Sequence, residues 1–227
     1  MAPRDTRSGV RNPIVVLLPG AVLALAAVAC GDPPPPPRTA PAWSSQGAGD
    51  RAARSGLAAE SWFPLVDGTI LQFRTSAESD EGPGGGILPA RVFRASARLG
   101  ELRMPSGTRR FEYREDGVAT LNRDGVWTLL LRLPVEPGAT WRGEHGGTAR
   151  WEAVDLAVDV PAGRFTGCAR VREERGGDRP AVYATTFCPG TGVVILEAAS
   201  GAVVERAELV YAGPPLDLGP DGVVRVP

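Results

Sequence analysis

The sequence predicts an all-β domain, a curved antiparallel meander sheet that forms a half-barrel, an open barrel or a sandwich. From about residue 60 onward, short runs rich in Val, Leu, Phe, Trp and Thr alternate with turn signals, and no long window keeps a helical period. The dipeptide Asp-Gly, a strong hairpin signal, occurs at Asp67-Gly68, Asp116-Gly117 and Asp124-Gly125. A sheet of about ten or eleven strands must curl to protect its edges.

Three arginines precede an uncharged, apolar run over residues 13–29. A basic head, an apolar run and small residues at its end are typical of a secretory signal peptide. The run is shorter than the roughly 20 apolar residues that a membrane-spanning helix needs, and Pro19-Gly20 interrupts it. We therefore interpret residues 1–29 as a signal peptide. A retained helix is the remaining alternative to cleavage.

The apolar run ends in Ala27-Val28-Ala29-Cys30-Gly31, which resembles the lipobox of bacterial lipoproteins. The resemblance implies cleavage before Cys30, a diacylglycerol thioether on Cys30 and acylation of the new amino terminus. Two or more acyl chains anchor a protein stably, whereas one chain anchors it only marginally. The alternative is an ordinary signal peptide followed by an incidental cysteine. Because Gly31 differs from the aspartate used for inner-membrane retention in enterobacteria, we expect the periplasmic face of the outer membrane.

Residues 30–58 are expected to form a disordered linker. Pro33–Pro37 favours the stiff polyproline II form. Residues 38–58 are rich in Ala, Ser, Gly and Arg and have little apolar surface to bury. A short helical turn is expected over Ala53–Glu60. The β domain follows over residues 59–213, with a tail over 214–227.

Eleven segments between the turn signals are predicted strands. They are Thr69–Thr75, Arg91–Arg98, Arg109–Arg114, Val118–Asn122, Trp127–Leu133, Thr140–Glu144, Ala149–Val160, Phe165–Glu173, Ala181–Phe187, Val193–Glu197 and Val203–Tyr211. Alternation supports this interpretation: Phe111 and Tyr113 share one face, while Glu112 and Arg114 take the other.

Cys168 and Cys188 flank the turn over residues 176–180, and residue 178 lies midway between them. In a simple hairpin they would lie directly opposite each other, at a separation that a disulfide can bridge. Export to an oxidising compartment favours that bond, and two free thiols or a bulged register are the alternatives. In this register the cysteines share a face with Arg170 and Arg172, so the disulfide is expected on the less buried side.

The sequence gives no positive sign of catalysis, and we expect a protein that is not an enzyme. Its one histidine, His145, is expected to be exposed and inert. Too few ligands remain for a zinc site built from His and Cys. There is also no P-loop and no Gly-x-Gly-x-x-Gly motif, so no cofactor is expected. Carboxylate groups that converge only in the folded protein remain formally possible.

The chain of 227 residues has a formal net charge of −1, and all 25 basic residues are arginine. A charge so close to zero gives no reason to expect nucleic acid as a partner, which would need a basic face. We attribute the arginine bias, with the abundant Gly and Pro, to GC-rich codon usage. The arginines are therefore not interpreted as anion-binding groups.

The domain resembles a loose group of uncharacterised exported lipoproteins from Gram-negative bacteria. The resemblance spans about residues 61–212 and rests on short elements that suit turns and cores. These elements are Phe63-Pro64-Leu65 with Gly68, Leu71 and Phe73; Leu133-Pro134 with Pro137-Gly138 and Trp141; Val160 to Gly163 with Phe165, Cys168 and Val171; and Pro189 to Val193 with Tyr211. It implies an open, strongly curved antiparallel sheet and no established activity.

Two functions remain open for the folded part. The first is a non-enzymatic envelope lipoprotein that contacts protein or cell-wall partners. The alternative is a periplasmic carrier or binding module for an apolar or lipid ligand. Its cavity would be lined by large aromatic side chains, which could equally form a plain core. They are Trp62, Phe73, Phe93, Trp127, Trp141 and Trp151.

Overall fold

The computed structural model describes residues 54–79, 82–215, 217–218 and 224–225 and confirms the all-β prediction. The predicted signal peptide, Cys30 and most of the predicted linker lie outside these residues. One short helix, α1 (Ala59–Trp62), precedes a twelve-stranded antiparallel sheet. Its strands are β1 (Ile70–Glu78), β2 (Gly84–Arg94), β3 (Leu99–Met104), β4 (Gly107–Arg114), β5 (Gly117–Leu121), β6 (Trp127–Arg132), β7 (Thr140–Arg142), β8 (Thr148–Val160), β9 (Gly163–Arg175), β10 (Ala181–Cys188), β11 (Gly192–Ser200) and β12 (Val203–Gly213). Two further short strands, β13 (Asp217–Leu218) and β14 (Val224–Arg225), pair only with each other.

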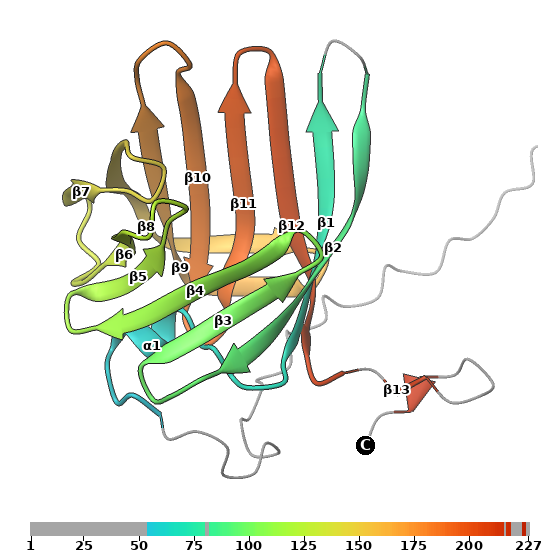
Figure 1. Ribbon diagram of the computed structural model, residues 1–227. Helices are drawn as coiled ribbons and strands as arrows, with labels where there is room; N and C mark the ends of the chain where they lie inside the picture. The colour runs from blue at the N-terminus through green and yellow to red at the C-terminus, as the bar shows by residue number, and fades with distance from the viewer. Residues whose placement is uncertain (1–53, 80–81, 216, 219–223, 226–227) are drawn as a thin grey trace, which may run out of the picture. The chain divides into compact units, whose positions relative to one another are not determined.

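The strand order makes the sheet a meander that closes on itself. The first and last strands, β1 and β12, pair in its middle, and every other strand pairs with a neighbour in the sequence. Strands β6 and β7 follow each other along the chain, yet they form the two edges of the sheet. Their connection brings the edges together, so the sheet curls into a nearly closed barrel (Figure 1).

Side chains, and not a strand ladder, join the two edges of the barrel. The indole N–H groups of Trp141 and Trp151 donate to the carbonyl oxygens of Leu129 and Arg132, at 3.2 and 2.9 Å. In return, the guanidinium of Arg132 donates to the carbonyl oxygen of Thr140 at 2.8 Å. These bonds satisfy backbone groups that a free sheet edge would leave to water. We call this junction the seam.

The main hydrophobic core fills the inside of the barrel. Its large buried side chains come from the entry segment and from both halves of the sheet: Phe63, Phe111, Tyr113, Leu131, Trp141, Trp151 and Phe187. The Tyr113 hydroxyl donates to the carbonyl oxygen of Phe63 at 2.6 Å and accepts from the Leu65 N–H at 2.9 Å. Burial raises the pKa of Tyr113 to about 12, so the hydroxyl stays protonated and holds the Phe-Pro-Leu segment against the core.

Tight turns set the strand boundaries, and Gly117 shows why one of them needs glycine. It follows Asp116 in the predicted turn between β4 and β5 and has a φ of 144°. A Cβ at this position would lie 2.0 Å from the carbonyl oxygen of Leu131 on the neighbouring β6. Only a residue without a side chain allows the backbones to approach this closely.

The far ends of β8 and β9 form a hairpin that leaves the barrel wall and passes behind β10, β11 and β12 in the view of Figure 1. Three register shifts between β8 and β9 bend it, and Asp155 at one of them has a φ of 54°. Its turn reaches β12, where the Ala162 N–H donates to the carbonyl oxygen of Leu209 at 2.9 Å. Leu156, Val158 and Phe165 of the hairpin pack against a second buried cluster.

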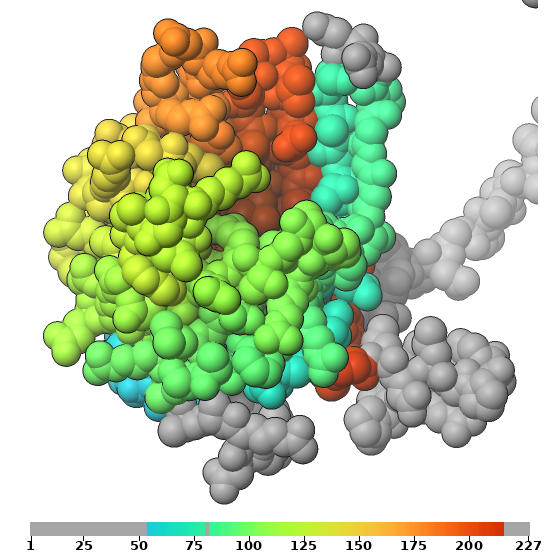
Figure 2. All heavy atoms as spheres, in the orientation of Figure 1, coloured from blue at the N-terminus to red at the C-terminus, as the bar shows by residue number. Residues whose placement is uncertain are grey.

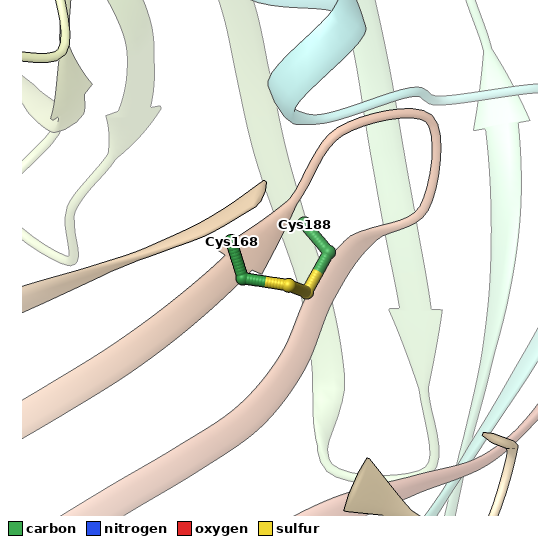
Figure 3. The surroundings of a disulfide bond; sticks show 2 residues. All are labelled: Cys168 and Cys188. Carbon is green, nitrogen blue, oxygen red and sulfur yellow. A yellow bond between two sulfur atoms is a disulfide. The ribbon is translucent and has the colours of Figure 1, made fainter. Parts of the chain in front are cut away.

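The structure contains the Cys168–Cys188 disulfide, with 4.2 Å between the Cα atoms, and it joins adjacent β9 and β10 (Figure 3). The expectation that the bond lies on the less buried side of the sheet is wrong. Both cysteines are fully buried, at 0% and 1% exposure. The reason is the bent hairpin, because Leu156 lies opposite Cys168 and covers this side.

The strand predictions fail in two places. Strand β3 (Leu99–Met104) was not predicted, because its arginine, glutamate and glycine residues break the apolar alternation. The glycine run over 82–86 was interpreted as a break, whereas β2 begins at Gly84 and continues through it. No helix in the described part of the chain is long and apolar enough to span a bilayer.

Candidate functional site

Two rows of directly opposed residues cross the inner face of the sheet from β8 to β2, and they show how its burial changes along the way. Directly opposed residues of an antiparallel pair lie on the same face. One row contains Trp151, Val171, Thr185, Leu196, Ala207, Thr75 and Gly86. The next contains Ala149, Glu173, Tyr183, Ala198, Glu205, Ala77 and Gly84. Both rows face the barrel interior, because Trp151 and Ala149 belong to the main core.

Both rows are more exposed overall towards β2, and both end in a glycine. Trp151 and Glu173 are buried, whereas Gly86 and Gly84 at the other end are exposed. Between them lies a patch that we call the open inner face. It consists of Thr75, Ala77, Thr185, Leu196, Ala198, Glu205 and Ala207. Glu205 is exposed, Ala207 is buried and the others are half-buried, and Figure 2 shows a hollow in front of β11 and β12.

A buried carboxylate marks the border between the filled core and the open inner face. Glu173 on β9 is 4% exposed. Its Oε1 accepts hydrogen bonds from the N–H groups of His145 at 2.9 Å and Gly147 at 2.8 Å, and its Oε2 lies 2.9 Å from Nδ1 of His145. Burial alone would raise the pKa of Glu173, but these bonds and the nearby imidazole outweigh it and lower the pKa.

The loop between β7 and β8 wraps around this carboxylate. A Cβ on Gly143 would lie 2.2 Å from Cδ of Glu173, so the loop can close only with glycine there. The ring of His145 stacks on that of Tyr183, with 3.6 Å between centroids and 5° between planes. Its Nε2 lies 3.7 Å from Oε1 of Glu144. The imidazole is therefore held between two carboxylates and an aromatic ring.

Glu144, in the same loop, forms an ion pair with Arg109 on β4. This ion pair connects the loop to the opposite wall of the barrel. Arg109 lies two residues before Phe111 of the main core and so shares its inner face. The guanidinium of Arg109 also lies over the Phe111 ring, 5.3 Å from its centroid. Arg109, Glu144, His145, Glu173 and Tyr183 thus form a polar cluster over the aromatic core, which we call the polar cap.

The polar cap has an acid and an imidazole in contact, as in the orienting half of a hydrolytic triad. Such a pair becomes catalytic only when the imidazole also meets a nucleophile. Among the described residues, the hydrogen bonds and ion pairs of the His145 side chain go to Glu173 and Glu144. The arrangement therefore orders the loop around Glu173.

Of the six aromatic residues considered for a cavity, Trp141 borders an open hollow of about 440 Å³, and the other five lie in the core or on the surface away from it. Trp62 and Trp141 pack on Trp151, with ring centroids 6.2 and 5.7 Å away, inside the main core. Phe73 is buried in the second cluster. Phe93 is 40% exposed beneath the guanidinium of Arg103, and Trp127 is half-buried with Arg114 above its ring.

Sequence reasoning missed the polar cap. His145 was expected to be exposed and inert, but its side chain is one-third exposed and in contact with Glu173. A signal for Glu173 was present, since Ala169, Val171 and Glu173 alternate along the apolar face of β9. The glycine-rich Gly143–Gly147 stretch was the signal for the loop. Arg109 and Tyr183 meet the loop only in the folded sheet, so no local sequence pattern indicates their part in the polar cap.

Two open hollows lie beside the polar cap, at the ends of β7 to β11. Their volumes are about 640 and 440 Å³, and they share Thr148, Glu174 and Gly176. Charged residues contribute to the lining of both, namely Arg172 and Arg175 in the larger and Arg142 in the smaller. In the described part of the chain, no group of three or more His, Cys, Asp or Glu residues is placed to hold a metal ion.

No protein family matches the sequence, and no curated protein matches it. Solved structures that are similar to the chain include two bacterial proteins. One is described as an exported protein with a YmcC-like fold from Bacteroides fragilis; it is 14% identical, with a TM-score of 0.44 over 66% of this chain and 98% of that one. The other is described as a lipoprotein from Parabacteroides distasonis; it is 12% identical, with a TM-score of 0.42 over 67% of this chain and 98% of that one.

Proposed function

We propose that this chain is an exported lipoprotein, anchored by lipid on Cys30 to the periplasmic face of the outer membrane. The proposal rests on the basic head, the short apolar run and the lipobox-like end of the first 30 residues. Feeding cells with labelled palmitate tests it. The wild type should become labelled and fractionate with outer membranes, and Cys30→Ala should lose the label. An unlabelled wild type contradicts the proposal.

The β domain is, in our proposal, a non-enzymatic module that contacts a protein partner through its open inner face. The observation that supports this most is the change in burial along the cross-strand rows, from the buried Trp151 and Glu173 to the half-buried Leu196 and Ala198 on β11. Leu196 and Ala198 supply apolar surface, and the polar residues Thr75, Thr185 and Glu205 share the face with them. An apolar centre with polar groups around it is the usual make-up of a protein interface.

Adjacent residues on β11 provide a matched test of this surface. Ala198 belongs to the open inner face, and Ala199 points to the other side of the sheet. A photo-crosslinking amino acid at position 198 should give a discrete protein adduct in intact cells. The same group at position 199 should not. Equal adducts from both positions, or none from position 198, contradict the proposal.

An apolar-ligand carrier is the second candidate, and the hollow in front of β11 and β12 is the observation that favours it (Figure 2). The packing of Trp62, Trp141 and Trp151 against one another counts against it, because these residues fill the space that a cavity would need. The probe N-phenyl-1-naphthylamine separates the two candidates. A carrier should bind the probe, and Ala198→Trp should abolish binding while Ala199→Trp preserves it.

A further inference from the structure

The loop Gly143–Gly147 contacts three strands from both halves of the sheet. It binds Glu173 on β9, stacks on Tyr183 of β10 and reaches Arg109 on β4. These strands are far apart in the sheet, since five strands lie between β4 and β10, and six lie between β4 and β9. The loop therefore holds the two walls of the barrel together above the core, at the border of the open inner face.

We propose that this loop is a pH-sensitive latch across the barrel, which tightens when His145 takes up a proton. The geometry supports the proposal because both ring nitrogens face carboxylates. Nδ1 lies 2.9 Å from Oε2 of Glu173, and Nε2 lies 3.7 Å from Oε1 of Glu144. A neutral imidazole has one N–H and can donate to one of them, whereas the charged form has two and is attracted to both.

Two arginines, Arg109 and Arg175, also lie near the loop. Arg109 approaches from β4, but it forms an ion pair with Glu144 and so reaches the imidazole through that carboxylate. Arg175 on β9 lies over the Tyr183 ring, 5.7 Å from its centroid. Tyr183 itself presents its ring face to the imidazole. A ring face attracts a cation, so the stack also favours the protonated form.

The direction of the pH response follows from these contacts. A second ring N–H lets the latch attract both Glu173 and Glu144, so acidification favours the closed loop. Glu173 stays ionised to lower pH than an ordinary glutamate, because the hydrogen bonds from the loop and the nearby imidazole lower its pKa against the effect of burial. In stronger acid Glu173 takes up a proton, and the latch loosens again.

Two signals report the latch directly. The chain has one histidine, so its ring resonance in an NMR spectrum is identified without assignment, and the stacked Tyr183 shifts it through its ring current. The amide protons of His145 and Gly147 both donate to Glu173, and their hydrogen exchange reports opening of the loop. In the wild type, opening corrected for the intrinsic rate should fall about threefold or more from pH 8 to 5.5, as expected for a modest ion pair.

Variants separate the latch from general stability. In His145→Gln the opening of the loop should become independent of pH over this range. Arg109→Ala should raise opening at both pH values, whereas Arg110→Ala, which removes a neighbouring ion pair with Glu101, should leave it unchanged. If His145→Gln does not fold, Glu144→Gln serves instead and should reduce the response. Wild-type opening that is equal at both pH values, or a full response in the variant used, overturns the proposal.

Discussion

The indole N–H of Trp151 on β8 donates a 2.9 Å hydrogen bond to the backbone carbonyl oxygen of Arg132 on β6. These two strands belong to opposite ends of the sheet, so this bond helps to close the barrel. Trp151 also packs against Trp62 and Trp141 in the core. One side chain thus links closure of the seam to packing of the interior, which explains how a sheet without a continuous ladder keeps a fixed curvature.

Replacing Trp151 tests this link. Trp151→Phe should lower the free energy of unfolding by about 2 kcal/mol or more, because it leaves the Arg132 carbonyl unpaired and a void in the core. Trp127→Phe is the matched control, since Trp127 is half-buried beneath Arg114, and should cost less than about 1 kcal/mol. Urea unfolding followed by far-ultraviolet circular dichroism measures both. Equal losses would mean that the seam bond and the packing of Trp151 contribute little.

The disulfide should stabilise the fold measurably. Cys168 and Cys188 are 20 residues apart, and cross-linking a loop of that size removes about 3 kcal/mol of chain entropy from the unfolded state. The double variant Cys168→Ala, Cys188→Ala should therefore lose about 2–4 kcal/mol in a guanidinium titration. Wild-type protein unfolded and refolded in reductant should match it. A loss below about 1 kcal/mol would show that the packing of the hairpin holds the bend without the bond.

The fold class could be predicted from the sequence because period-two alternation and turn residues are local. The pairing of Cys168 with Cys188 followed in the same way, since a hairpin register is fixed by its turn. The direction that the hairpin takes afterwards depends on three bulges in β8, and a bulge leaves no strong sequence signature. For that reason the burial of the disulfide was predicted wrongly.

The polar cap shows what local patterns leave out. Glu173 and His145 are 28 residues apart, and Arg109 and Glu144 are 35 apart. Only the register of the sheet brings them together. The aromatic residues have clear local patterns, but these patterns do not reveal burial. Trp151 and Phe93 both lie in predicted strands, yet Trp151 is 1% exposed and Phe93 is 40% exposed. Composition identifies large apolar side chains but does not say on which face of a strand they lie.

Glu173 should make the protein sensitive to acid. Its pKa is lowered in the folded state, so it stabilises the fold above the ordinary value of 4.5, and this contribution is lost as the pH falls through the folded-state value. Glu173→Gln should be less stable than the wild type at pH 7, and the difference should shrink as the pH falls below 4.5. Urea titrations at several pH values measure it, with exposed Glu205→Gln as the control. A difference that stays constant with pH would contradict the role of the charge.

Gly143 should be irreplaceable for steric reasons. A Cβ there would lie 2.2 Å from Cδ of Glu173, and that carboxylate is fixed by three hydrogen bonds from the loop and cannot move aside cheaply. Gly143→Ala should therefore displace the loop and cost about 2 kcal/mol or more, as expected when a buried hydrogen-bonded network is broken. Gly176→Ala is the matched control, because nothing lies within 4 Å of a Cβ at that position. Thermal unfolding should give a clearly lower midpoint for Gly143→Ala alone, and the His145 resonance should lose its ring-current shift from Tyr183. Retention of that shift with unchanged stability would show that the loop tolerates the extra methyl group, and that the glycine is not required for the carboxylate clamp.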